Sequence, residues 1–130
     1  MTPIAILIVD DEPITREMLA MILQIERPAW MVYGVECGQD ALEIAATHEI
    51  HLALLDIAMP EMDGIELCQR LREMPKMAQV PIVMFTGFDN PGRRVRAREA
   101  GANDYWLKPF LPSQIVPKIE QLIGADQTLK

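Results

Sequence analysis

The feature that most constrains the fold is the alternation of short apolar runs with segments of helical periodicity. Continuous apolar runs occupy residues 4–9, 51–55 and 82–85, and weaker candidates lie at 31–36 and 105–107. Short runs rich in apolar and β-branched residues are typical of strands buried on both faces, as in parallel sheets. The pattern therefore predicts five strands.

The segments between these runs have apolar residues at helical spacing. The first has a stripe that includes Ile14, Met18 and Ile25, and the others lie at 39–47, 65–72, 93–100 and 114–123. Pro117 falls inside the last segment, which predicts that this helix begins late or irregularly. Five alternations of strand and helix predict an α/β domain, a doubly wound parallel sheet of five strands with helices on both faces.

Length and composition favour one folded domain. The chain has 130 residues, of which 50% are hydrophobic and 24% charged, so it can fill a single core. We expect the domain to cover residues 1–124 and the polar residues 125–130 to be a tail or the start of a linker. No signal peptide and no apolar stretch long enough to cross a bilayer is evident, which predicts a cytoplasmic protein without membrane contact.

The net charge of −7 disfavours direct binding to nucleic acid, because phosphate binding draws on clustered Lys and Arg. The charge is uneven: residues 1–65 carry 12 acidic and 2 basic side chains, whereas residues 66–130 carry 7 acidic and 10 basic ones. Four arginines lie close together at positions 93, 94, 96 and 98. They predict either a solvated helix or a charged face used for dimerisation or for an acidic partner.

Polar residues follow the ends of the expected strands, where open α/β sheets bind their ligands. They are Asp10, Asp11 and Glu12 after the first run, Asp56 after the third strand, Thr86 after the fourth, and Lys108 after the fifth. Carboxylates at close range repel one another, and a bound Mg²⁺ turns that repulsion into coordination. A hydroxyl and an ammonium beside them suit a phosphoryl group, and an aspartate so placed suits nucleophilic attack on phosphorus.

Four motifs of this chain resemble the receiver domain of bacterial two-component response regulators. They are residues 8–12 (IVDDE), 54–64 (LLDIAMPEMDG), 86–87 (TG) and 101–110 (GANDYWLKPF). The resemblance covers essentially the whole chain. It implies the flavodoxin-like receiver fold with strand order 2-1-3-4-5.

The resemblance also implies roles for individual residues. Asp56 would be the phosphoacceptor, and Asp10, Asp11, Asp56 and the backbone carbonyl of Ala58 would hold Mg²⁺. Thr86 and Lys108 would bind the phosphoryl oxygens. Thr86 would move inward upon phosphorylation and let Tyr105 turn from an exposed to a buried position. Lys108-Pro109 would be a cis peptide.

Partners follow from the same resemblance. The phosphoryl donor would be a sensor histidine kinase or a phosphotransfer protein. The face made by the fourth helix, fifth strand and fifth helix would control a partner, a homodimer, or an output domain C-terminal to this chain. Such a domain is a signalling phosphoacceptor that catalyses only its own phosphorylation and slow dephosphorylation, not an enzyme with a separate substrate.

Two alternatives stay open. A receiver-like scaffold would bind partners without phosphorylation, and no sequence feature favours it. A Mg²⁺-dependent phosphohydrolase of the haloacid-dehalogenase type would carry D-x-D-x-T or D-x-D-x-V after the first strand, whereas residues 10–14 read DDEPI. The chain departs from the commonest receiver pattern in having apolar Ala58 and Phe88 two positions after Asp56 and Thr86. Neither side chain can orient a hydrolytic water, which predicts a long-lived phosphorylated state.

Overall fold

A computed structural model describes residues 3–128 and contains one parallel sheet of five strands in the order β2-β1-β3-β4-β5. The strands are β1 (Ala5–Val9), β2 (Met31–Val35), β3 (Leu52–Asp56), β4 (Ile82–Thr86) and β5 (Asp104–Leu107). All four neighbouring pairs are parallel, with β3 in the centre and β1 and β4 on either side of it. The predicted fold class and strand order are confirmed.

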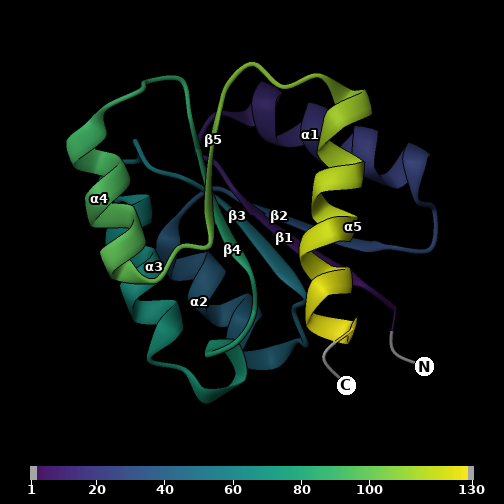
Figure 1. Cartoon of the computed structure of the whole chain (residues 1–130), viewed down its shortest axis with the longest axis horizontal. Helices are drawn as coiled ribbons and strands as arrows, with labels where there is room; N and C mark the ends of the chain where they lie inside the picture. The colour runs from purple at the N-terminus through teal and green to yellow at the C-terminus, as the bar shows by residue number, and fades with distance from the viewer. Residues whose placement is uncertain (1–2, 129–130) are drawn as a thin grey trace.

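Helices cover both faces of the sheet (Figure 1). They are α1 (Pro13–Glu26), α2 (Gly38–Thr47), α3 (Gly64–Arg72), α4 (Pro91–Ala100) and α5 (Pro112–Thr128), and a short 3₁₀ turn spans Pro75–Met77. The side chains of β1 alternate between two cores. Leu7 packs with α2, α3 and α4, whereas Ile6 and Ile8 pack with α1 and α5. Because both faces are buried, the strand reads as a continuous apolar run.

The fifth helix differs from the prediction. It begins at Pro112, earlier than expected, and continues through Pro117. Proline suits the first helical position, because no intrahelical bond is required of its nitrogen. At position 117 the missing N–H leaves the Ser113 carbonyl without its usual donor, and the exposure of Ser113 leaves that carbonyl accessible to water. Ile115, Val116 and Ile119 on the same helix are buried, and this packing outweighs the lost bond.

Helix α5 also extends past residue 124, the expected end of the domain, to Thr128. Residues 125–128, part of the expected tail or linker, are therefore helical, and residues 129 and 130 lie outside the described part. The domain boundary at 124 stays a prediction. Within residues 3–128, no helix is both long and apolar enough to cross a membrane.

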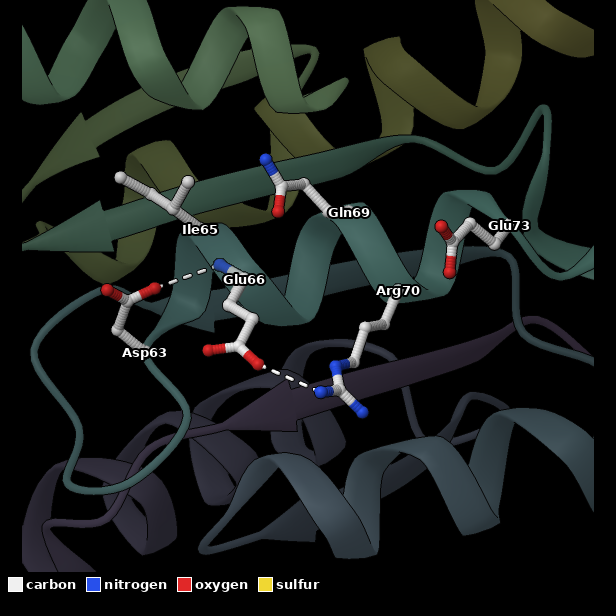
Figure 2. Close-up of a pocket in the computed structure, with 6 residues that line it drawn as sticks. All are labelled: Asp63, Ile65, Glu66, Gln69, Arg70 and Glu73. Carbon is white, nitrogen blue, oxygen red and sulfur yellow. Dashed lines mark hydrogen bonds and ion pairs between the residues drawn. The ribbon is translucent and has the colours of Figure 1, made fainter.

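Helix α3 begins with a polar cap that follows directly from the sequence. The Asp63 carboxylate accepts a hydrogen bond from the Glu66 amide at 2.8 Å, which satisfies one of the free donors of the first turn. Figure 2 shows this cap and the ion pair between Glu66 and Arg70, whose atoms lie 3.0 Å apart. The hollow along this helix is lined by the surface of a single helix, and its one cation, Arg70, is already paired with Glu66, so we do not assign it a ligand.

Candidate functional site

The acidic residues after β1 and β3 lie together at the carboxyl edge of the sheet. Carboxylate oxygens of Asp10, Asp11 and Asp56 lie within 4.8 Å of one another. Asp10 is fully buried and Asp56 is 6% exposed, whereas Asp11 is exposed. The predicted clustering is confirmed, because parallel strands β1 and β3 are neighbours and end side by side.

Lys108 is the cation of this cluster. Its Nζ atom lies 3.0 Å from Asp10 Oδ2 and 3.7 Å from Asp56 Oδ2. The backbone positions it, since the Lys108 amide donates to the Thr86 carbonyl at 2.8 Å. The Lys108-Pro109 peptide is cis, as predicted. The ammonium group therefore bridges the two buried carboxylates. Lys108 and Asp10 are 98 residues apart in the sequence, and the fold brings them together.

Burial changes the acidity of Asp56. The pKa of its carboxyl group is raised from its ordinary value to about 6: desolvation by burial is the largest cause, the nearby charge of Asp10 adds to it, and the ammonium of Lys108 opposes it. In the metal-free protein the cost of burying a second negative charge thus exceeds the benefit of the single ammonium. A divalent cation would relieve this repulsion. Three carboxylates at this separation are the oxygen donors that a hard cation such as Mg²⁺ prefers.

Thr86 ends strand β4 and is 2% exposed. Its hydroxyl accepts a hydrogen bond from the Phe88 amide at 3.3 Å, and the Phe88 carbonyl in turn accepts one from the Tyr105 hydroxyl at 3.2 Å. The two peptide groups of Phe88 thus connect Thr86 to Tyr105. Tyr105 is partly exposed, and the Arg94 guanidinium carbon lies 4.5 Å from the centre of its ring.

Ala58, the predicted carbonyl ligand, lies in the loop that follows β3 and has an exposed side chain. Its backbone N–H lowers the pKa of Asp56 by hydrogen bonding, which places its peptide beside the carboxylate. Gly64 closes this loop. A Cβ atom there would lie 2.3 Å from the Asp56 carbonyl oxygen, so only glycine lets the start of α3 approach the end of β3.

Arg16 is a residue of the site that the sequence reasoning missed. Its Nη1 donates to the Asp10 carbonyl at 2.8 Å, and its stem lies against Gly34, where a Cβ would be 3.3 Å from Arg16 Cγ. The sequence contains one indication of this role: Arg16 is a lone basic residue one turn into the helix that follows the acidic loop. The guanidinium group fixes the peptide that joins the two neighbouring aspartates.

Comparison with known proteins agrees with this geometry. The family model of the response regulator receiver domain matches residues 6–120. The chain belongs to the response regulator receiver domain family. The fold is therefore that of a response regulator receiver domain, and the haloacid-dehalogenase alternative is set aside.

The chain is similar to named regulators in sequence and in structure. The chain is 40% identical over 123 residues to the transcriptional regulatory protein SrrA of Staphylococcus aureus, covering 95% of this chain and 49% of SrrA. It therefore spans about half the length of this curated relative. A receiver domain from Methanospirillum hungatei superposes with a TM-score of 0.91 at 26% identity, covering 99% of this chain and 100% of that one.

A third relative is informative about the metal. The receiver domain of a sensor histidine kinase from Pseudomonas aeruginosa superposes with a TM-score of 0.84 at 27% identity, over 95% of this chain and 99% of that one. Its structure is described as having a magnesium ion coordinated in the active site cleft. The carboxylate cluster of the present chain has the chemistry that such an ion requires.

Proposed function

We propose that this receiver domain is a phosphorylation-controlled switch in which Asp56 accepts a phosphoryl group from a sensor histidine kinase or a phosphotransfer protein. The observation that carries the proposal is the convergence of Asp56 with Asp10, Asp11 and Lys108 at one sheet edge. A buried carboxylate beside two others and one ammonium is arranged for a reaction that brings in a cation and a phosphoryl group.

The reaction follows from the positions of these groups. An Asp56 oxygen attacks phosphorus, the phosphorus–nitrogen bond of the donor phosphohistidine breaks, and the imidazole nitrogen keeps the electron pair and takes a proton from solvent. Asp10, Asp11, Asp56 and the Ala58 carbonyl would hold Mg²⁺, which when bound neutralises charge on the phosphoryl oxygens. Lys108 is near enough to Asp56 to bind a phosphoryl oxygen placed there.

The switch uses the chain of contacts from Thr86 to Tyr105. When the Thr86 hydroxyl turns to a phosphoryl oxygen it leaves the Phe88 amide, and the loop after β4 rearranges. Tyr105 bonds the carbonyl of the same residue, so its ring follows the loop. The face formed by α4, β5 and α5 then changes its affinity for a partner or for an output domain.

Intact-mass measurement after treatment with acetyl phosphate and Mg²⁺ tests the proposal. The parent should gain one phosphoryl group, and Asp56→Asn, which keeps the shape but loses the nucleophile, should gain none. A parent that gains no phosphoryl group under conditions in which Mg²⁺ binds would favour the scaffold alternative. Omitting Mg²⁺ should abolish the gain in the parent.

A further inference from the structure

Helix α1 directs one basic side chain back to the acidic loop between β1 and α1. The Arg16 Nη1 atom donates to the Asp10 carbonyl at 2.8 Å, and Arg16 makes no ion pair with any carboxylate of the described residues. Pairing with a carboxylate of the nearby cluster would give a stronger bond. The guanidinium group instead binds a neutral oxygen, which belongs to the peptide between Asp10 and Asp11.

The two neighbouring aspartates are held very differently. The Asp10 carbonyl accepts from Arg16, and its two carboxylate oxygens accept from the Glu12 amide at 2.9 Å and from the Lys108 ammonium at 3.0 Å. Asp11 is exposed and, among the described residues, makes no hydrogen bond or ion pair. The direction of the Asp11 carboxylate therefore depends on its backbone, and so on the peptide plane that Arg16 holds.

The Arg16 side chain reaches this peptide by passing over Gly34 of strand β2. A Cβ atom at Gly34 would lie 3.3 Å from Arg16 Cγ and 3.5 Å from Arg16 Cδ. The φ angle of Gly34 is not positive, so the backbone conformation does not require glycine there. Glycine inside a strand weakens it and often marks a close approach by another group. The Arg16 stem is the group that approaches Gly34.

We propose that Arg16 is a positioning residue for the metal site and that Gly34 leaves the space that the Arg16 side chain needs. By holding the peptide between Asp10 and Asp11, Arg16 keeps the Asp11 carboxylate beside those of Asp10 and Asp56, where the three can share one Mg²⁺. Groups that orient metal ligands raise metal affinity without touching the metal. This inference rests on the proposed function, because it assumes that Mg²⁺ binds at the carboxylate cluster.

The charge of Arg16 makes the inference testable by the sign of an effect. A cation near a metal site repels Mg²⁺, so if Arg16 acted only through its charge, its removal would tighten Mg²⁺ binding. If Arg16 acts through the peptide, its removal weakens Mg²⁺ binding despite the lost repulsion. The two roles therefore predict opposite changes in affinity for Arg16→Met, which keeps an apolar stem and loses the donor and the charge.

Metal affinity is measured by titrating the full chain with Mn²⁺, whose free ion is quantified by electron paramagnetic resonance, and by displacing Mn²⁺ with Mg²⁺. Both ions suit carboxylate and carbonyl ligands. Arg16→Met should weaken the binding of each ion by about ten-fold, the lower end of the range for groups that orient metal ligands. Arg16→Lys keeps a donor and the charge but loses the planar fork, and should recover part of the affinity.

Arg27→Met is the matched control, because it removes the same charge from the opposite end of the same helix. Arg27 is the C-terminal cap of α1 and pairs with Glu120. It lies about 16 Å further along the helix axis than Arg16, which exceeds the distance over which physiological salt screens exposed charges. Arg27→Met should therefore bind both ions as the parent does. Tighter binding in Arg16→Met, or equal changes in Arg16→Met and Arg27→Met, would overturn the inference.

Gly34 provides an independent variant that leaves Arg16 and every charge in place. Gly34→Val suits a strand but should displace the Arg16 stem, which weakens the binding of each ion by about five-fold. Because both residues act through one contact, Arg16→Met combined with Gly34→Val should weaken binding little more than Arg16→Met alone. Losses that multiply in the double variant would overturn the pairing of the two residues. Gly34→Val also keeps the test available if Arg16→Met does not fold.

Two further measurements separate positioning from general damage and from the proposed function. Urea unfolding in EDTA identifies the variants that fold. In acetyl phosphate labelling, Arg16→Met should raise the half-saturating Mg²⁺ concentration by a larger factor than it lowers the rate at saturating Mg²⁺, and a fall in the saturated rate alone would overturn the inference. A parent that binds neither ion would contradict the proposed function. Binding in the parent with unchanged affinity in Arg16→Met would leave the proposed function standing and overturn this inference alone.

Discussion

At the scale of single residues, the burial of Asp56 lowers the stability of the folded protein at neutral pH. Its folded-state pKa of about 6 exceeds the ordinary value of 3.8, so the folded protein binds the proton more tightly than the unfolded chain does. The resulting stabilisation is complete below about pH 4 and is lost as pH rises through about 6. At neutral pH the metal-free protein therefore carries a buried charge that disfavours folding and that the proposed phosphorylation of Asp56 requires.

Asp56→Asn should consequently stabilise the metal-free protein at pH 7, by on the order of 2 to 3 kcal/mol. The gain should shrink as pH falls from about 6 to about 4, where the parent carboxyl is protonated in the folded state. Urea unfolding in EDTA at several pH values measures it. Glu43→Gln, which removes an exposed charge, is the control, and a pH-independent gain in Asp56→Asn would contradict this account.

The lifetime of the phosphorylated state is a second property of single residues. Ala58 is exposed and Phe88 is 68% exposed, and neither has a polar side-chain atom to hold a water. We expect autodephosphorylation to take minutes or longer, measured by loss of the phosphoryl mass after the donor is removed. Ala58→Asn should shorten the lifetime by supplying an amide, and Ala46→Asn on the α2 surface should not. A parent half-life of seconds would contradict the prediction.

At the scale of elements, the loop from β3 to α3 depends on backbone proximity. Asp63-Gly64 has the residue types of a turn, in which glycine is free to adopt a positive φ. The positive φ in this loop belongs instead to Glu61, at 66°, and Gly64 is required because its Cα approaches the Asp56 carbonyl. Turn chemistry could be predicted from the sequence, but a contact between the backbones of two elements could not.

Gly64→Ala should therefore destabilise the domain by about 3 kcal/mol, near the upper end for overpacking, because backbone cannot move aside as a side chain does. It should also reduce phosphorylation, since the displaced atoms belong to Asp56. Gly87→Ala is the matched control, because an added Cβ at Gly87 meets nothing within 4 Å. Thermal unfolding and acetyl phosphate labelling of the two variants test this prediction. Equal stability of Gly64→Ala and Gly87→Ala would contradict it.

Arg72 joins three segments that are separate in sequence. Its guanidinium group donates to the carbonyls of Gly101, Met77 and Val80 and to the Asn103 side chain, at 2.6 to 3.0 Å. Burial lowers its pKa. It thereby holds the C-terminal end of α4 and the segment before β4 against α3. No periodicity or motif marked it, because its partners are backbone atoms brought together only by the fold.

Arg72→Met should cost about 3 to 5 kcal/mol, because the carbonyls of three buried or half-buried residues and the exposed Asn103 side chain lose a charged donor. Arg70→Met on the same helix should cost less than about 1 kcal/mol, since Arg70 makes only an exposed ion pair with Glu66. Chemical denaturation of both variants tests the difference. Similar losses would mean that the network around Arg72 contributes no more than a surface pair.

At the scale of the whole molecule, the sequence predicted most of what local patterns determine. Apolar runs located all five strands within one or two residues, and residues at strand ends correctly indicated the acidic cluster. The path of α5 through Pro117 could not be predicted, because the burial of Ile115, Val116 and Ile119 on the sheet outweighs a local rule.

Mg²⁺ bound at the carboxylate cluster, as we propose, would couple the stability of the whole fold to the site. A cation that binds the folded site and not the unfolded chain stabilises the protein by about 2.7 kcal/mol at a hundred times its dissociation constant. For a chain of this size that corresponds to roughly 10 °C in the midpoint of thermal unfolding. The site collects ligands from the ends of β1 and β3, which are separated by more than forty residues in the sequence, so unfolding disperses them.

The midpoint of the parent should accordingly rise with Mg²⁺ concentration along a binding curve. Asp56→Asn should begin from a higher midpoint in EDTA and gain less from Mg²⁺, because the buried repulsion is already reduced and one anionic ligand is missing. The unfolding midpoints of the parent and of Asp56→Asn should therefore converge as the Mg²⁺ concentration increases. Calorimetry at neutral pH measures this, with Glu43→Gln as the control that should keep the parent's full response. Parallel curves for the parent and Asp56→Asn would mean that the cation binds elsewhere on this acidic protein.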